Sequence, residues 1–285
     1  MSPPPLDQLP SVREHLEVHQ LWADKKLGQH FLLDLNITRK IVRAAGDLTG
    51  RVVVEVGPGP GGLTRALLET DVTGVLAIEK DTRVLPLLAE ISALDNRLQT
   101  LSADALAVDV IAEAQSRFGD GPVHVIANLP YNVGTPMLIA WLKQIQDLEA
   151  LTLMFQLEVA ERIVAEPGQK AYGRLAVLAQ AVADCHLAFR LPAQAFTPPP
   201  KVDSAVVSLR PKPDGLTLEM LKGLETVTAA AFGQRRKMLR QSLKSVPGPL
   251  SGEALCAAAG LPSTARAEEI DIKGFLRLVA AISDQ

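Results

Sequence analysis

Cysteine is nearly absent from this sequence: Cys185 and Cys256 are the only two in 285 residues, and neither belongs to a CxxC pair or a histidine cluster. This pattern indicates neither a disulfide framework nor a zinc site, so we expect no metal. Long apolar runs are also missing, and the N-terminus has no basic segment followed by an apolar core. We therefore expect no membrane association and a cytoplasmic protein.

A strong net charge is missing too, since 29 Lys and Arg stand against 32 Asp and Glu. From residue 201 onward, however, 12 cations face 9 acids, whereas residues 1–200 carry 17 cations and 23 acids. The densest basic stretch contains Arg235, Arg236, Lys237, Arg240 and Lys244, and a smaller basic pair is formed by Lys25 and Lys26. Local patches decide contact with polyanions, so these residues are candidates for nucleic-acid binding. A solvated helix surface is the alternative.

What the chain does have is a hydrophobic fraction of 47%, enough for a substantial core. From residue 52 short β-branched runs alternate with longer helical segments. The predicted strands cover residues 52–56, 74–79, 98–101, 124–127 and 151–155, and the helices that follow them cover residues 61–69, 82–91, 105–117, 134–145 and 158–165. This alternation predicts a parallel sheet covered by helices on both faces. Residues 188–191 and 205–209 would complete a Rossmann-like, seven-stranded α/β sheet.

Breaker residues suggest three parts. Residues 1–24 are Pro-rich and predict a loosely held leader with a short helix near residues 11–21. Residues 25–211 would form the sheet domain, which ends at the cluster Pro211-Lys-Pro-Asp-Gly215. Residues 212–285 would form a small all-helical domain, with helices over 217–232, 235–243, 253–259 and 272–282.

A glycine-rich turn follows the first predicted strand, with Gly57, Gly59 and Gly62 opening the next helix. Glycines there allow a tight turn and close approach to a nucleotide. The spacing also fits the dinucleotide fingerprint, so a nicotinamide-dependent oxidoreductase stays open as an alternative. Three acids favour S-adenosylmethionine instead: Glu55 inside the first strand, Glu79 at the end of the second, and Asp104 just after the third. We expect Glu79 to bind ribose hydroxyls and Asp104 to bind the adenine amine of the cofactor.

The turn Asn128-Leu-Pro-Tyr131 ends the fourth predicted strand, next to the crevice where open α/β sheets bind ligands. An exocyclic adenine amine is a poor nucleophile and benefits from two hydrogen-bond acceptors. The Asn128 side-chain oxygen and the Leu129 carbonyl would supply them. Pro130 would stiffen the turn, and Tyr131 would stack on the base, which is worth roughly 1–3 kcal/mol.

Two flanking segments fit the same pocket. The stretch Leu27-Gly-Gln-His-Phe-Leu32 precedes the glycine turn, so His30 and Leu32 are candidates for contact with the cofactor. The Pro-rich segment Phe196-x-Pro-Pro-Pro-Lys-Val-x-Ser204 presents Phe196 as a second stacking face for the base, and Lys201 as a further RNA contact. A loop with a core phenylalanine is the alternative for this segment.

Together these motifs resemble the family of ribosomal RNA adenine dimethyltransferases, which includes the bacterial small-subunit enzyme and the erythromycin-resistance methylases. The matching motifs also include Ile78-Glu-Lys80 and Phe232-Gly-Gln-Arg-Arg-Lys237, and they run in the family's order from about residue 25 to residue 244. The resemblance implies contacts with S-adenosylmethionine at His30, Leu32, Gly57, Glu79, Asp104 and Asn128. Many relatives have Asn at the position of His30, which leaves a side-chain contact there open.

The resemblance further implies transfer of two methyl groups to each of two adjacent adenosines. The basic motif and the helical C-terminal part look closer to the small-subunit enzyme, whose substrate is a hairpin loop near the 3′ end of 16S rRNA in an assembling 30S particle. We expect a monomer. Two alternatives remain: a large-subunit methylase that confers antibiotic resistance, and a ribosome-assembly factor without turnover.

Overall fold

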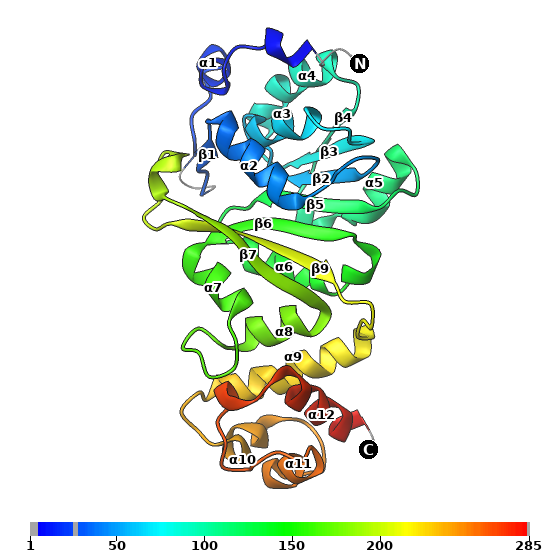
Figure 1. Ribbon diagram of the computed structural model, residues 1–285, viewed down its shortest axis with the longest axis vertical. Helices are drawn as coiled ribbons and strands as arrows, with labels where there is room; N and C mark the ends of the chain where they lie inside the picture. The colour runs from blue at the N-terminus through cyan, green and yellow to red at the C-terminus, as the bar shows by residue number, and fades with distance from the viewer. Residues whose placement is uncertain (1–4, 25–27, 284–285) are drawn as a thin grey trace. The chain divides into compact units, whose positions relative to one another are not determined.

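The computed structural model describes residues 5–24 and 28–283. Within these residues the chain divides into two compact units (Figure 1). The first unit takes in the described residues up to Ala140, together with Gln146–Ala160 and His186–Arg210. The second contains Trp141–Ile145, Glu161–Cys185 and the described residues from Pro211 onward. The second unit is therefore discontinuous along the chain, unlike the predicted domain of residues 212–285.

A seven-stranded sheet dominates the first unit, with the strand order β4-β3-β2-β5-β6-β9-β7 (Figure 1). Its strands are β2 (Val52–Val56), β3 (Gly74–Glu79), β4 (Leu98–Ser102), β5 (Val123–Asn128), β6 (Ala150–Gln156), β7 (Ala183–Leu191) and β9 (Ser204–Pro211). β2 to β6 are parallel, and β9 runs antiparallel to β6. This strand order confirms the predicted Rossmann-like α/β sheet. The sequence could predict it because parallel strands covered on both faces read as continuous apolar runs.

Helices pack on the sheet through a shared hydrophobic core. The helices of this unit are α2 (Leu35–Ala45), α3 (Gly62–Leu68), α4 (Leu85–Leu94), α5 (Val110–Phe118), α6 (Gly134–Leu142) and α7 (Leu157–Val164), of which the last two extend into residues of the second unit. Leu67 of α3 and Leu88 of α4 are buried in one cluster with Val53 and Val75 of the sheet. α2 begins at Asp34, whose carboxylate accepts a hydrogen bond from the Asn36 amide at 2.8 Å.

The crevice that holds the site follows from the strand order. The chain starts the sheet at β2, crosses to β3 and β4 on one side, and then returns to β5 on the other side of β2. The loops that follow β2 and β5 therefore leave the same edge in opposite directions. Open α/β sheets bind ligands at this switch point.

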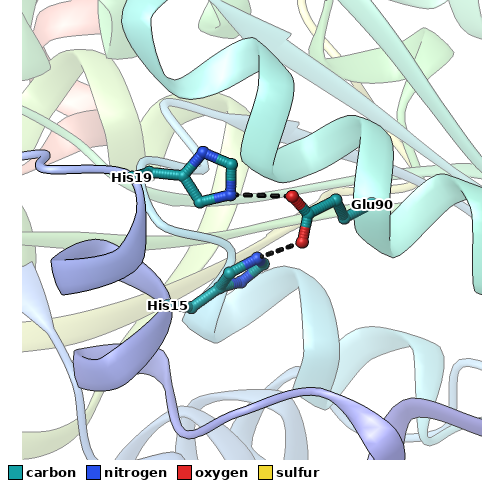
Figure 2. Close-up of side chains that lie close together, drawn as sticks. All are labelled: His15, His19 and Glu90. Carbon is teal, nitrogen blue, oxygen red and sulfur yellow. Dashed lines mark hydrogen bonds and ion pairs between the residues drawn. The ribbon is translucent and has the colours of Figure 1, made fainter.

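The segment before the sheet is packed, contrary to the predicted loose leader. It contains α1 (Val12–Val18), and Leu6, Leu16 and Leu21 belong to the hydrophobic core. His15 and His19 both point at Glu90 of α4 and hydrogen-bond to it at 2.8 Å each (Figure 2). A Pro-rich composition does not reveal these apolar anchors, which are spread thinly along the segment.

His15, His19 and Glu90 also bring three potential metal-ligand atoms within 4.8 Å of one another. The guanidinium of Arg65 lies 2.7 Å from His15 Nδ1, and an arginine can only donate. The ring proton of His15 therefore lies on Nε2, which donates to Glu90. In this arrangement Nε2 has no lone pair for a metal, and the three side chains hold α1 against α4.

A separate two-stranded ribbon joins distant parts of the first unit. β1 (Phe31–Leu32) pairs antiparallel with β8 (Phe196–Thr197). The sequence did not predict either strand, because a two-residue strand has no periodicity of its own. The ribbon brings the segment before α2 beside the Pro-rich loop.

The second unit is helical. It contains α8 (Arg174–Val182), α9 (Leu218–Gly233), α10 (Leu239–Ser242), α11 (Gly252–Ala258) and α12 (Ile272–Ser283). Its core includes an aromatic cluster in which Phe232 stacks on Phe275 at 5.5 Å between ring centroids and meets Tyr172 edge-on at 6.0 Å. The helix predicted over residues 235–243 is wrong in its first half, because Met238 is extended and pairs with Arg266. No helix among the described residues is long and apolar enough to span a bilayer.

Candidate active site

A cavity of about 260 Å³ lies at the carboxyl edge of the sheet, in the first unit. It is lined by the loops that follow β2, β3, β4 and β5, and by the segment that contains β1. Most of the predicted site residues line it: His30, Leu32, Glu55, Gly57, Gly59, Glu79, Asp104, Asn128, Leu129, Pro130 and Tyr131. Leu106, Asn132 and Met137 also line the cavity and were not predicted.

The glycine loop is held close to its neighbours. The Gly57 amide donates to the Ile78 carbonyl of β3 at 2.9 Å, which ties the loop to the adjacent strand. Gly59 has a φ of +49°, and a Cβ at this position would lie 3.1 Å from the Phe31 ring. A larger residue at Gly59 would therefore be strained in its backbone and crowded by the ribbon.

Glu79 ends β3 and anchors the glycine loop. Its carboxylate accepts hydrogen bonds from the Gly59 amide at 3.2 Å and from the Asp81 amide at 2.7 Å. Burial raises the pKa of this carboxyl above its ordinary value. Glu79 lines the cavity, and a carboxylate oxygen can accept more than one hydrogen bond, so Glu79 can hold the loop and still accept from hydroxyl groups.

Glu55 has a buried carboxyl oxygen that lacks a hydrogen-bond partner in the described parts of the chain. Its Oε2 accepts a 2.6 Å hydrogen bond from the Thr64 hydroxyl of α3, whereas its buried Oε1 has no partner. Burial raises the pKa of this carboxyl to about 8. A buried acceptor without a donor is costly, and a cationic or hydrogen-bonding ligand in the cavity would relieve it.

Asp104 follows β4 in a more exposed position. Its carboxylate caps the next turn through the Leu106 amide at 3.0 Å and pairs with the Lys80 ammonium at 2.8 Å. The hydrogen bond from Lys80 is the main cause that lowers the pKa of this carboxyl. Asp104 is therefore an ionised acceptor at the rim of the cavity.

Asn128 ends β5 with its side chain in a defined orientation. Its Nδ2 donates to the His30 carbonyl at 3.2 Å, and a carbonyl can only accept. This contact fixes the amide so that Oδ1 is the atom left over. Within residues 5–24 and 28–283, no group donates a hydrogen bond to Oδ1.

The backbone of the same turn offers a second acceptor. Among the residues described, none donates to the Leu129 carbonyl. The carbonyl of the next residue, Pro130, accepts from the Val133 and Gly134 amides at 3.1 Å each, which fixes the turn at the start of α6. The turn thus combines a held backbone with two neutral oxygens that have no donor.

Tyr131 is braced from two directions. Its hydroxyl is 2.7 Å from the Ser204 hydroxyl at the start of β9, and its ring stacks on the His30 ring with 5.6 Å between centroids. The His30 Nδ1 in turn donates to the Pro198 carbonyl at 2.7 Å. Sequence reasoning missed Ser204 and Pro198 as supports, although both lie in the Pro-rich motif that it singled out.

Phe196 does not lie with the other predicted residues. Its side chain is 3% exposed, belongs to the hydrophobic core and does not line the cavity. Phe196 pairs with Leu32 in the ribbon, and its ring is buried there. The stacking role predicted for Phe196 has no open ring face in this structure, and the core position that was the alternative is the one observed.

The predicted RNA contacts have different environments. Lys25 and Lys26 lie outside the described residues, and Lys201 is exposed at the tip of the Pro-rich loop. In the second unit Arg235 is already engaged, because it pairs with Glu268 at 2.8 Å and donates to the Lys170 carbonyl at 2.6 Å. Arg236 and Lys237 are exposed, Arg240 is half-buried, and within the described residues none of these three forms an ion pair.

The parallel sheet, the glycine loop and the acids at successive strand ends define a Rossmann-like methyltransferase. A family model described as ribosomal RNA adenine dimethylase matches residues 21–284. The chain belongs to this family.

Individual proteins agree with this assignment. The chain is 57% identical over 276 residues to a protein of Phenylobacterium zucineum named ribosomal RNA small subunit methyltransferase A, covering 97% of this chain and 94% of the relative. A protein of the same name from Caulobacter vibrioides is 58% identical over 260 residues, which cover 91% and 97% of the two chains.

Solved structures give the same result. A dimethyladenosine transferase from Plasmodium falciparum is similar with a TM-score of 0.74 and 25% identity, covering 90% of this chain and 98% of that one. A 23S rRNA methyltransferase has a TM-score of 0.67 at 25% identity, with coverage of 90% and 100%.

Proposed function

We propose that this protein transfers methyl groups from S-adenosylmethionine to the N6 amine of adenosines in small-subunit ribosomal RNA, two on each of two adjacent adenosines in a hairpin loop near the 3′ end. The relatives of high identity bear the name of a small-subunit methyltransferase. A substrate of this kind implies action in the bacterial cytoplasm during ribosome assembly.

One observation carries the chemistry: two neutral acceptors without donors, Asn128 Oδ1 and the Leu129 carbonyl, lie in a cavity lined by acids at the other strand ends. An adenine amine has two N–H bonds for them. Donating both pulls electron density toward nitrogen and orients its lone pair. A nicotinamide-dependent oxidoreductase would not need such a pair.

The residues present fit the proposed cofactor. Glu55 Oε1 is a buried acceptor without a partner, and the amino group of the methionine moiety is a suitable donor for it. Glu79 suits ribose hydroxyls, and Asp104 with the exposed Leu106 suits the adenine at the rim. When bound, S-adenosylmethionine supplies an electrophilic methyl group on a sulfonium sulfur.

The protein's own residues then act mainly by positioning. Asn128 and Leu129 hold the amine, and the His30–Tyr131–Ser204 contacts keep the turn in place. Orientation of this kind lowers a barrier by at most roughly 7–11 kcal/mol. Each transfer forms one N–C bond, breaks one S–C bond and releases one amine proton. After the first transfer one N–H remains, and either acceptor can still hold it.

The test is mass spectrometry of ribosomal RNA nucleosides after incubation of the purified protein with labelled S-adenosylmethionine and separated, unmethylated ribosomal subunits. We expect labelled dimethyladenosine in the small-subunit RNA. Label in large-subunit RNA would support the substrate of the similar 23S enzyme instead. The absence of label from both RNAs would contradict the enzymatic function.

The second unit offers a further test of RNA binding. Replacing Arg236 and Lys237 by Gln should flatten the dependence of log affinity on log salt by roughly 0.7–0.9 for each lost phosphate contact. Replacing Arg235 should leave the slope nearly unchanged, because its charge is paired with Glu268. Filter binding to small-subunit RNA at several salt concentrations measures both slopes. Equal slopes for the Arg236/Lys237 variant and the wild type would show that these cations do not contact RNA.

A further inference from the structure

A second hollow of about 250 Å³ lies in the same unit as the catalytic cavity. Its apolar lining includes Leu16 and Leu21 from the N-terminal segment and Phe31 and Pro198 from beside the ribbon. Trp22 stands at this hollow with 70% of its surface exposed. Proteins that bind unpaired nucleotides stack the bases on aromatic side chains, and the exposed indole offers such a face.

The polar groups of the hollow suit the edge of a base. Arg13 and Glu17 lie four residues apart on α1, and both line the hollow. Neither has an ion-pair partner in the part of the chain that the structure describes. Together they offer a donor and an acceptor, and adenine presents both an amine donor and ring-nitrogen acceptors along one edge. A bare phosphate would be repelled by Glu17.

The wall that carries these side chains is firmly held. His15 of α1 and His19, which caps its C-terminus, both hydrogen-bond to Glu90 of α4 (Figure 2). Arg65 adds hydrogen bonds to His15 and to the Pro10 carbonyl. A wall that is already ordered loses little conformational entropy when a ligand binds.

The hollow and the catalytic cavity share a boundary. Phe31 lines both of them, and the Pro198 carbonyl accepts the hydrogen bond from His30, which stacks on Tyr131. An RNA strand whose target adenosine lies in the cavity would therefore have its neighbouring nucleotides near the ribbon.

From these observations we infer that the hollow beside Trp22 is a subsite for an unpaired nucleobase of the RNA substrate, next in the strand to the adenosine being methylated. The inference rests on the proposed function. It gives the second of two adjacent adenosines a place while the first reacts. The base stacks on the indole, and Arg13 and Glu17 bind its edge.

The test compares Trp22→Ala and Trp22→Phe with the matched control Val18→Ala. Val18 is the last residue of α1, four residues before Trp22, is 71% exposed and does not line the hollow. The substrates are unmethylated small-subunit particles and a naked RNA hairpin with two adjacent adenosines in its loop. We expect Trp22→Ala to raise KM for both by about 5- to 150-fold, with Trp22→Phe intermediate. Val18→Ala should match the wild type, and all variants should bind S-adenosylmethionine equally.

A second readout uses the protein's own fluorescence. The chain has two tryptophans, and Trp141 is 2% exposed, so quenching by RNA reports on Trp22. Quenching should disappear when the nucleotide beside the target is abasic. A KM for Trp22→Ala within about twofold of the wild type would overturn the subsite while leaving the proposed function intact. An effect with particles but none with naked RNA would also overturn it, in favour of a protein contact. If the wild type methylates neither substrate, the result would instead contradict the proposed function.

Discussion

The two halves of the catalytic cavity differ in the kind of acceptor they present. At the ends of β2, β3 and β4 the acceptors are the carboxylates of Glu55, Glu79 and Asp104. At the end of β5 they are the neutral oxygens of Asn128 and Leu129. Most carboxylate oxygens already accept a hydrogen bond, whereas the two neutral oxygens have no donor among the described residues.

This difference matches the two ligands that the halves would hold. A cofactor with an ammonium group and ribose hydroxyls suits buried or paired carboxylates. A target amine is uncharged and a weak nucleophile. An ionised group beside it would more readily bind a proton than orient the amine. Binding by charge and positioning by neutral dipoles are therefore separated along one sheet edge.

The strongest test of this separation is Asn128→Ala. We expect kcat/KM for methyl transfer to fall by about 100- to 1000-fold, as for other oriented polar groups at a reacting centre. The affinity for S-adenosylmethionine should be weakened far less, because Asn128 acts mainly on the target amine. Asn128→Asp has nearly the same shape but cannot donate to the His30 carbonyl. We therefore expect this variant to lose as much activity as Asn128→Ala. Substantial activity in Asn128→Ala would contradict the positioning role.

The next largest effect should come from Glu55→Gln. Losing one charged hydrogen bond should weaken S-adenosylmethionine binding by about 10- to 150-fold, while turnover at saturation changes less. Because burial raises the pKa of Glu55 to about 8, the carboxyl must lose a proton before it can pair with an ammonium group. Cofactor affinity of the wild type should therefore increase as the pH rises through this value and then level off.

Calorimetry in buffers of different ionisation enthalpy measures the proton release at neutral pH. We expect release for the wild type and none for Glu55→Gln. Equal proton release by both proteins would place the linked group elsewhere.

A smaller effect is expected at the brace behind the catalytic turn. Tyr131→Phe and Ser204→Ala each remove one hydrogen bond, and each should lower methyl transfer by about 2- to 10-fold. The double variant should be no worse than either single one, because both remove the same bond. Steady-state kinetics on the three variants gives the coupling. Additive losses would mean that the two hydroxyls act independently.

Asp104→Asn should have the smallest effect. The carboxylate is exposed and paired with Lys80, and exposed ion pairs contribute about 0–1 kcal/mol. Cofactor affinity should fall by less than about fivefold. Equilibrium binding compares this variant with Glu55→Gln, and a larger loss for Asp104→Asn would reverse the order of the two carboxylates.

The sequence predicted the parts of the site that depend on local pattern. β2 and β3 begin and end where the apolar runs do, and the acids that follow those runs line the cavity. Parallel strands bring their carboxyl ends to one edge, so the order along the chain was enough to group Glu79, Asp104 and Asn128.

Contacts between segments far apart in the chain could not be predicted from local sequence pattern. The pairing of Phe31–Leu32 with Phe196–Thr197 buries Phe196 and turns the Pro-rich loop into a support for Tyr131. The packing of α1 depends on partners in α3 and α4 that no local pattern reveals. Composition alone also could not separate Arg235, which is paired, from its exposed neighbours.

The bond from Asn128 to position 30 has a consequence for how this site tolerates change. The acceptor is a main-chain oxygen, which every amino acid supplies. The side chain at position 30 can therefore change without loss of the hydrogen bond that orients the Asn128 amide. Histidine can stand at this position for this reason. Its imidazole is then free to take up the separate task of steadying Pro198 and Tyr131.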